Sequence, residues 1–124
     1  MMGSRIWAYK VQEIIAESGR NASLLCQFPN NNHISLNWTR VDHMEKYVYL
    51  HRDGHFDPYN QHPSFKNRVD LQDRQMKDGD VSLILMNVTI NDTGTYECRV
   101  FVGETSSWKS ISIISLRVVV PPGE

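Results

Sequence analysis

The stretch Asp92-Thr93-Gly94-Thr95-Tyr96-Glu97-Cys98 decides the fold, together with two earlier residues, Cys26 and Trp38. Trp38 follows Cys26 by 12 residues, which allows one strand, one turn and half of a second strand. An indole at that position can pack on a disulfide between Cys26 and Cys98, between two packed sheets. Tyr96 lies two residues before Cys98, where a tyrosine corner would return its hydroxyl to nearby backbone. These positions predict a β-sandwich scaffold and leave these side chains no role in chemistry.

Short segments rich in β-branched and aromatic residues fill the rest of the chain, with turn signals between them. Asp53-Gly54 supplies the positive φ angles of a tight hairpin. No helical periodicity lasts longer than a turn. We therefore predict an all-β fold with two antiparallel sheets, about nine strands and one inter-sheet disulfide. The expected strands are residues 6–9 with 11–15, 22–28, 35–41, 47–52, 55–57, 68–71, 81–86, 95–102 and 108–120.

Composition and charge exclude several classes of function. Thirteen Lys and Arg against fourteen Asp and Glu give a net charge of −1, and no block of like charges suits nucleic acid or an anionic membrane. No stretch approaches the roughly 18 apolar residues that cross a bilayer. Two cysteines are too few for a metal cluster and instead indicate a disulfide. The chain also contains four Asn-x-Ser/Thr sequons, which with the disulfide favour the secretory pathway. The sequons begin at Asn21, Asn37, Asn87 and Asn91.

The domain organisation is simple. We expect residues 1–4 to be a cloning remnant or a disordered start, and residues 5–120 to form one domain. Pro121-Pro122-Gly123 cannot continue a strand, so residues 121–124 are expected to be a linker towards a further domain or a stalk. We expect the parent protein to be anchored in the plasma membrane, with this domain on its extracellular side.

The disulfide, tryptophan and tyrosine pattern resembles the variable-type (V-set) immunoglobulin superfamily, from about Tyr9 to Val120. Between Trp38 and Tyr96 there is room for four strands, which favours the variable over the constant type. Arg68 and Asp92 match the family's salt bridge at the bottom of the sandwich. The last strand lacks the Phe-Gly-x-Gly segment of antigen-receptor variable chains.

Two further segments are similar to the butyrophilin and costimulatory-ligand group, which includes myelin oligodendrocyte glycoprotein. They are Tyr47-Val48-Tyr49-Leu50-His51-Arg52-Asp53-Gly54 and Gly79-Asp80-Val81-Ser82-Leu83-Ile84-Leu85-Met86-Asn87-Val88. The second resemblance is to the coxsackievirus and adenovirus receptor and its adhesion relatives.

Catalytic and metal-binding patterns are missing from the sequence. No nucleophile elbow, phosphate loop or paired carboxylates surround the Ser, His and Asp residues, so we expect no enzyme and no cofactor. Histidines are expected in solvated loops, because no cysteine or carboxylate completes a tetrahedral zinc set around them. They are His33, His43, His51, His55 and His62.

Strand alternation predicts a binding face. If Leu36, Trp38, Val48, Leu50, Tyr96 and Cys98 point inward, the alternating residues point outward. These are Asn37, Thr39, Tyr47, Tyr49, His51, Glu97, Arg99 and Phe101. Exposed aromatic residues with an arginine are typical anchors of protein interfaces. The alternative is that they only stabilise exposed cross-strand pairs. The predicted partner-binding residues are Tyr47, Tyr49, His51, Arg99, Phe101 and Trp108.

The resemblance implies an immune-regulatory receptor or ligand that engages a protein counter-receptor on another cell through this face. The alternative is a self-associating adhesion molecule. Nucleic acid and small-molecule substrates are not expected as partners. A glycan at Asn37 would stand in the middle of the predicted face, so either this sequon is poorly used or its glycan restricts which partners dock.

Overall fold

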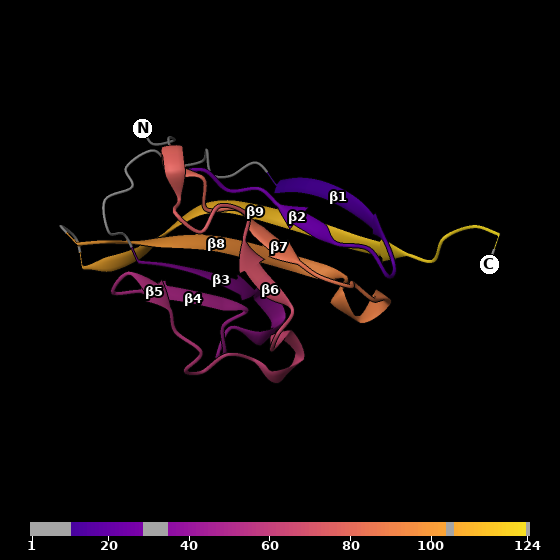
Figure 1. The fold of residues 1–124 in the computed structure, drawn as a ribbon, viewed down its shortest axis with the longest axis horizontal. Coiled ribbons are helices and arrows are strands. Elements are labelled where there is room, and N and C mark those ends of the chain that lie inside the picture. Colours follow the sequence, from indigo (N-terminus) through magenta and orange to yellow (C-terminus); the bar gives the residue numbers. More distant parts are fainter. Residues whose placement is uncertain (1–10, 29–34, 104–105, 124) are drawn as a thin grey trace, which may run out of the picture.

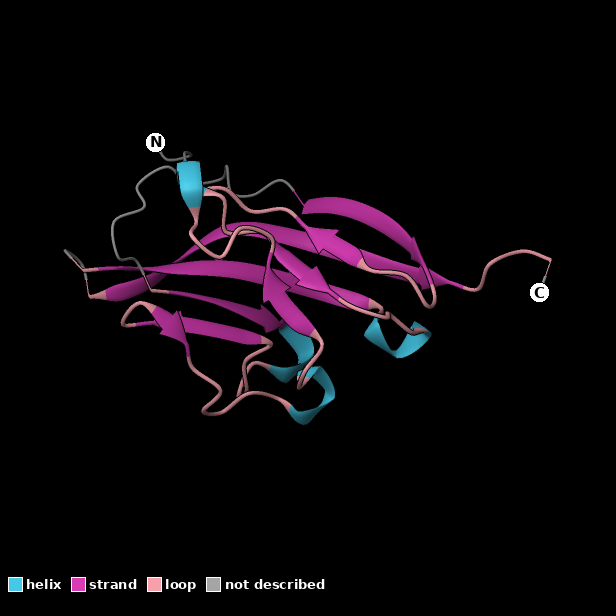
Figure 2. Ribbon diagram, viewed as in Figure 1, coloured by secondary structure: helices cyan, strands magenta, loops and turns pink. Residues whose placement is uncertain are grey.

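The computed structural model describes residues 11–28, 35–103 and 106–123. In this part of the chain the structure is built from strands, with four short 3-10 helices in the connections (Figures 1 and 2). The strands are β1 (Val11–Glu17), β2 (Ala22–Leu24), β3 (Leu36–Arg40), β4 (Tyr49–Arg52), β5 (His55–Phe56), β6 (Val69–Leu71), β7 (Leu83–Leu85), β8 (Gly94–Val102) and β9 (Ser107–Val119). The helices are η2 (Val41–His43), η3 (Pro63–Phe65), η4 (Lys77–Gly79) and η5 (Ile90–Asp92).

The strands form two layers, as the sequence predicted. A six-stranded sheet has the order β1-β9-β8-β3-β4-β5, and a three-stranded sheet has the order β2-β7-β6. In Figure 1 the smaller sheet lies in front of the larger one. The hairpin between β4 and β5 turns at Asp53 and Gly54, whose φ angles are 54° and 84°, so the predicted positive φ angles are confirmed. The predicted strand at residues 6–9 and the predicted loop histidine His33 lie outside the described residues.

One strand pair differs from the others in direction. All pairs are antiparallel except β1 with β9, where Val11 to Glu17 run parallel to residues 113–119. The turn after Glu17 leads β2 into the other sheet, so β1 forms no hairpin with its neighbour in sequence. β1 is therefore free to pair with the distant β9, in a direction that strand periodicity does not specify.

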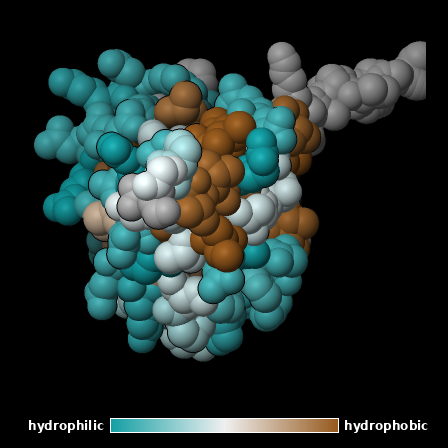
Figure 3. Space-filling model, turned by 90° about the vertical axis from the view of Figure 1, so that its right-hand side faces the viewer, coloured by the Kyte–Doolittle hydropathy of each residue, from teal (hydrophilic) through white to brown (hydrophobic). Residues whose placement is uncertain are grey.

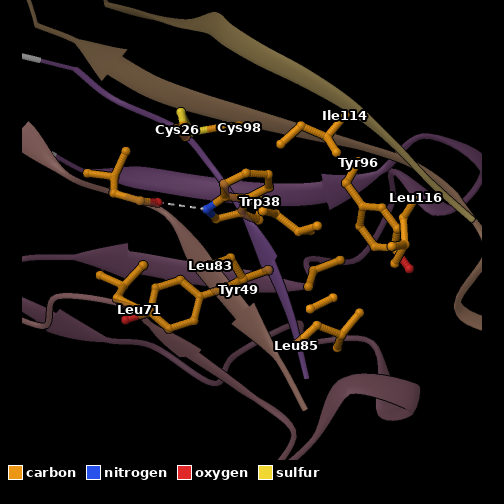
Figure 4. Packing of buried hydrophobic residues seen from close by; sticks show 14 of the residues in the cluster. Cys26, Trp38, Tyr49, Leu71, Leu83, Leu85, Tyr96, Cys98, Ile114 and Leu116 are labelled. Atoms are coloured by element: carbon orange, nitrogen blue, oxygen red, sulfur yellow. Dashed lines mark hydrogen bonds between the residues drawn. A yellow bond between two sulfur atoms is a disulfide. The ribbon is translucent and has the colours of Figure 1, made fainter. Parts of the chain in front are cut away.

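The core lies between the two sheets and surrounds the disulfide. Cys26 and Cys98 are bonded across the sandwich, and Trp38 is fully buried beside them (Figure 4). The indole Nε1 donates a hydrogen bond to the Val81 carbonyl at 3.1 Å, which satisfies its polar atom in the other sheet. The predicted inter-sheet disulfide and the packing of the tryptophan are both confirmed.

The bottom of the sandwich is closed by a buried polar cluster. Tyr96 is fully buried, and its hydroxyl donates to the Asp92 carbonyl at 2.5 Å, which is the geometry of a tyrosine corner. Arg68 reaches the Asp92 carboxylate with Nη2 at 2.5 Å and Nη1 at 3.3 Å. The same carboxylate accepts the backbone N–H of Thr89 at 2.9 Å. Asp92 therefore joins η5 to β8 and to the loop before β6.

The described residues contain no helix that is long and apolar enough to span a bilayer.

Candidate functional site

The register of β4 corrects part of the predicted binding face. Tyr49 lies directly opposite Trp38, and His51 lies opposite Leu36. Residues opposite each other in a pair of strands share a face, so Tyr49 and His51 point into the sandwich, where they are 5% and 6% exposed. Figure 4 shows the Tyr49 ring beside Leu71, in the core. The prediction that Tyr49 and His51 face outward is therefore wrong.

Leu50 takes the outward place. It is paired with Asn37, which lies between the inward-facing Leu36 and Trp38, and although it is only 4% exposed it is not part of the core cluster. The prediction that Leu50 points inward is therefore wrong. An irregular segment containing η2 joins β3 to β4, so the inward and outward alternation of β3 cannot be extended into β4. Val48, just before the strand, is buried in the core as predicted.

Burial changes the chemistry of the two displaced residues. It raises the pKa of Tyr49 to about 12, and the nearby Asp70 carboxylate adds to this shift against the opposing effect of Arg74. Burial also lowers the pKa of His51, with a further contribution from His55. The Tyr49 hydroxyl lies 3.4 Å from His51 Nδ1. These residues line a hollow of about 430 Å³ between β4, β5 and β6, away from the predicted face.

The remaining outward residues form what we call the outer face, the side of the six-stranded sheet that points away from the three-stranded sheet. It is ordered in rows that cross neighbouring strands. One row runs from Thr39 through Glu97 to Ile113, and the next from Leu50 through Asn37 and Arg99 to Ser110; the last pairs Phe101 with Trp108. The outer face is thus Thr39, Glu97, Ile113, Leu50, Asn37, Arg99, Ser110, Phe101 and Trp108.

The aromatic pair is the most prominent apolar feature of the outer face. The Phe101 and Trp108 rings meet edge to face, with their centroids 5.4 Å apart. Phe101 is 38% exposed and Trp108 is partly buried. An aromatic pair that remains accessible at the end of a hairpin can supply apolar contact area to a partner at low cost in side-chain entropy.

Tyr47, the last of the six predicted binding residues, is partly buried and lies before β4 begins. Its backbone bonds to Asn60 and His62 and forms an isolated parallel bridge with Gln61. It is therefore tied to the connection after β5, and the structure does not bring it into the rows of the outer face.

Unpartnered polar atoms are concentrated on the outer face. Five buried side-chain nitrogen or oxygen atoms of the described residues lack a hydrogen-bond partner. They belong to Asn37, Thr39, Arg99 and Ser110, all members of the outer face. Buried polar groups in native proteins are nearly always bonded, so this clustering marks the outer face as the part of the described structure whose polar atoms are least satisfied by the protein itself. Sequence reasoning missed Leu50, Ile113 and Ser110, for which only the register gives a signal.

The four sequons differ in exposure. Asn21, Asn87 and Asn91 are exposed, and none belongs to the outer face. Asn37 is fully buried, and its Nδ2 atom, the attachment point of a glycan, is among the buried atoms without a partner. A glycan at Asn37 is therefore incompatible with this packing.

A second apolar surface lies at one end of the sandwich. Figure 3 shows a hydrophobic stripe at the end where β9 finishes, bordered by hydrophilic residues. Exposed apolar residues of the elements that meet at this end are Ile15, Ile90 and Val120, at 59%, 59% and 64% exposure. No group of three or more potential metal ligands occurs in the described ranges.

Fold and site together define a variable-type immunoglobulin sandwich whose larger sheet has one face turned away from the smaller sheet. The profile of the immunoglobulin V-set domain matches residues 10–119, and the chain belongs to that family. It is 31% identical over 110 residues to mouse "Selection and upkeep of intraepithelial T-cells protein 8", covering 86% of this chain and 27% of the relative. It is 30% identical over 110 residues to human "Butyrophilin subfamily 1 member A1", covering 86% of this chain and 20% of that relative. The chain thus spans about a quarter of these relatives.

Solved structures agree with the fold. A chain in the crystal structure of ICOS in complex with ICOS-L superposes with a TM-score of 0.75 at 22% identity, covering 89% of this chain and 55% of that chain. The predicted resemblance to butyrophilins and costimulatory ligands is confirmed. The domain is accordingly related to immune-regulatory ligands and receptors.

Proposed function

We propose that this domain is the extracellular protein-binding module of a cell-surface immune-regulatory receptor or ligand, and that it engages a counter-receptor through the outer face. The observation that carries the proposal is the accessible Phe101–Trp108 pair, one row from Arg99. Protein interfaces concentrate their binding energy in a few aromatic and arginine anchors surrounded by weaker contacts. The partly exposed Ile113 extends the apolar part of the same face, whereas Leu50 is only 4% exposed.

The positions of the exposed sequons support this choice of face. Asn21 immediately precedes β2 and Asn87 follows β7, so both flank the three-stranded sheet. Asn91 lies in η5, just before β8 begins. Glycans on these three residues would shield the opposite sheet and one end, and leave the outer face accessible.

The relatives support a protein as the partner. One structural neighbour is a complex between two proteins, ICOS and ICOS-L. Enzymatic activity is not part of the proposal, because the outer face offers no arrangement of nucleophile and base. Self-associating adhesion remains the second candidate, favoured by one observation: Glu97 and Arg99 carry opposite charges on the same face of β8, so a second copy could pair with both.

A cell-binding assay tests the proposed face. Multimers of the parent domain, Phe101→Ala and Trp108→Ala are titrated on immune and epithelial cells, with thermal melts of each variant. We expect each substitution to weaken binding by about 1–2 kcal/mol or more with the melting temperature unchanged. The matched control is Tyr59→Ala, which removes an aromatic residue that is 73% exposed and lies outside the outer face.

Two results would contradict the proposal. If both variants bind cells like the parent while they remain folded, the outer face is not the binding surface. If the parent binds no cells but forms dimers in analytical ultracentrifugation across a concentration series, adhesion becomes the better assignment.

A further inference from the structure

Arg99 has no counter-ion in the described part of the chain. Six ion pairs form there, and none includes Arg99. Glu97 lies two residues earlier on the same face of β8 without pairing with it. A partly buried cation is costly unless a negative group compensates it. Within the described residues, Arg99 is therefore an uncompensated charge at the centre of the outer face.

The neighbours of Arg99 are also incomplete. Asn37 lies opposite it on β3 and Ser110 opposite it on β9. The Asn37 amide nitrogen and oxygen, Arg99 Nε and Ser110 Oγ are all buried without hydrogen-bond partners. Three of these atoms can donate hydrogen bonds. The row therefore places the Arg99 charge between two neutral side chains, whose buried polar atoms do not neutralise it.

The terminal nitrogens of Arg99 are the accessible part of the site. Arg99 is partly exposed, and its Nη1 and Nη2 atoms form no hydrogen bond with the described residues, in contrast to the buried Nε. A planar guanidinium favours a carboxylate, which it binds through two parallel hydrogen bonds. The Phe101–Trp108 pair lies beside it, where it would exclude water from such a contact and strengthen it.

We propose that Arg99, flanked by Asn37 and Ser110, binds an Asp or Glu side chain of the protein partner. This inference rests on the proposed function, because it specifies what the partner presents to the outer face. The negative charge of Glu97 repels a carboxylate from one side, so the acidic side chain approaches from the side of Phe101 and Trp108. An apolar group next to the partner's carboxylate then contacts the aromatic pair.

The test uses small carboxylates as probes, so that it does not depend on the identity of the counter-receptor. The ¹⁵N-labelled domain is titrated with N-acetyl-glutamate, while the Arg99 Nε–Hε and Asn37 side-chain signals are followed by NMR. N-acetyl-glutamine is the neutral control, and methyl glucuronide represents a carboxylate on a sugar. We expect N-acetyl-glutamate to shift both signals and N-acetyl-glutamine to leave them unchanged.

Variants localise the effect. Arg99→Gln should weaken N-acetyl-glutamate binding at least about tenfold. Arg117→Gln is the matched control, because Arg117 is exposed on β9 and has no ion pair in the described residues; its titration should match the parent's. Glu97→Gln should tighten binding, since it removes the nearby negative charge. This last variant keeps the test decisive if Arg99→Gln does not fold.

The outcomes separate the two proposals. Equal responses to the glutamate and glutamine probes, or no response to either, would overturn the carboxylate site. A response to methyl glucuronide that exceeds that to N-acetyl-glutamate would assign the site to an acidic sugar and overturn the protein source. If the titration succeeds while cells bind the parent and Phe101→Ala equally, the carboxylate site stands and the proposed function fails.

Discussion

Tyr49 lies directly opposite Trp38 in the pair formed by β3 and β4, and this pairing assigns its ring to the core. The ring stacks on Phe56 with a centroid distance of 5.0 Å and packs near Leu71 (Figure 4). A residue whose sequence position suggests a binding anchor therefore supports the sheet from inside.

Tyr49→Ala should destabilise the domain rather than change its binding surface. Removing a buried aromatic ring costs transfer free energy and leaves a cavity, so the free energy of unfolding should fall by about 3–5 kcal/mol. Tyr49→Phe should cost no more than about 1.5 kcal/mol, because the hydroxyl makes only a long contact to His51. Urea denaturation measures both. A Tyr49→Ala variant as stable as Tyr59→Ala would show that Tyr49 is not a core residue.

Asp92 should be more important for stability than a surface ion-pair residue. Its carboxylate is 5% exposed in the pair with Arg68 and also accepts the Thr89 backbone N–H. Asp92→Ala leaves the Arg68 guanidinium and that N–H uncompensated, so we expect a loss of about 3–5 kcal/mol. Urea denaturation of Asp92→Ala, Arg68→Ala and the double variant gives the coupling energy between the two side chains. The exposed pair of Arg20 with Glu17 is the comparison, with an expected coupling of about 0–1 kcal/mol; equal couplings for the two pairs would contradict the prediction.

The buried His51 should make the folded domain less stable in mild acid. Its pKa is lowered in the folded state, mainly by burial, so protons bind more tightly to the unfolded chain. The stability that the neutral imidazole provides is therefore present above its unfolded pKa of about 6.5 and declines as the pH falls below that value. Urea denaturation between neutral and mildly acidic pH should show a steeper decline for the parent than for His51→Gln. His62, whose pKa is also lowered by burial, remains in both proteins. Parallel pH profiles would rule out the contribution of His51.

Exposure predicts which sequons carry glycans. In protein secreted from a glycosylating host, we expect occupied sites at Asn21, Asn87 and Asn91 and an unmodified Asn37, whose Nδ2 atom is buried. Peptide mass spectrometry after enzymatic deglycosylation gives the occupancy of each site. A folded, fully occupied Asn37 would mean that the packing of the outer face around it opens in the secreted protein.

The disulfide, the tyrosine corner and the hairpin turn could be predicted from the sequence, because each depends on residue spacing or turn chemistry within short segments. The spacing of Cys26, Trp38 and Cys98 leaves one way to place an indole on a disulfide between sheets, and Tyr96 reaches backbone only four residues away. The positive φ angles at Asp53 and Gly54 follow from local turn chemistry. Within β8, alternation alone separates the inward Cys98 from the outward Arg99.

Relations between strands required the tertiary structure. Strand alternation has a period of two, so an irregular connection of unknown phase, such as the one between β3 and β4, can invert every side chain that follows it. That inversion placed Tyr49 and His51 inside and Leu50 outside. The sequence by itself thus determined the sandwich, its disulfide and its family. Only the three-dimensional register decided which side chains share the outer face, and that Asn37, Arg99 and Ser110 meet in one row, because hydrogen bonding between distant segments sets that alignment.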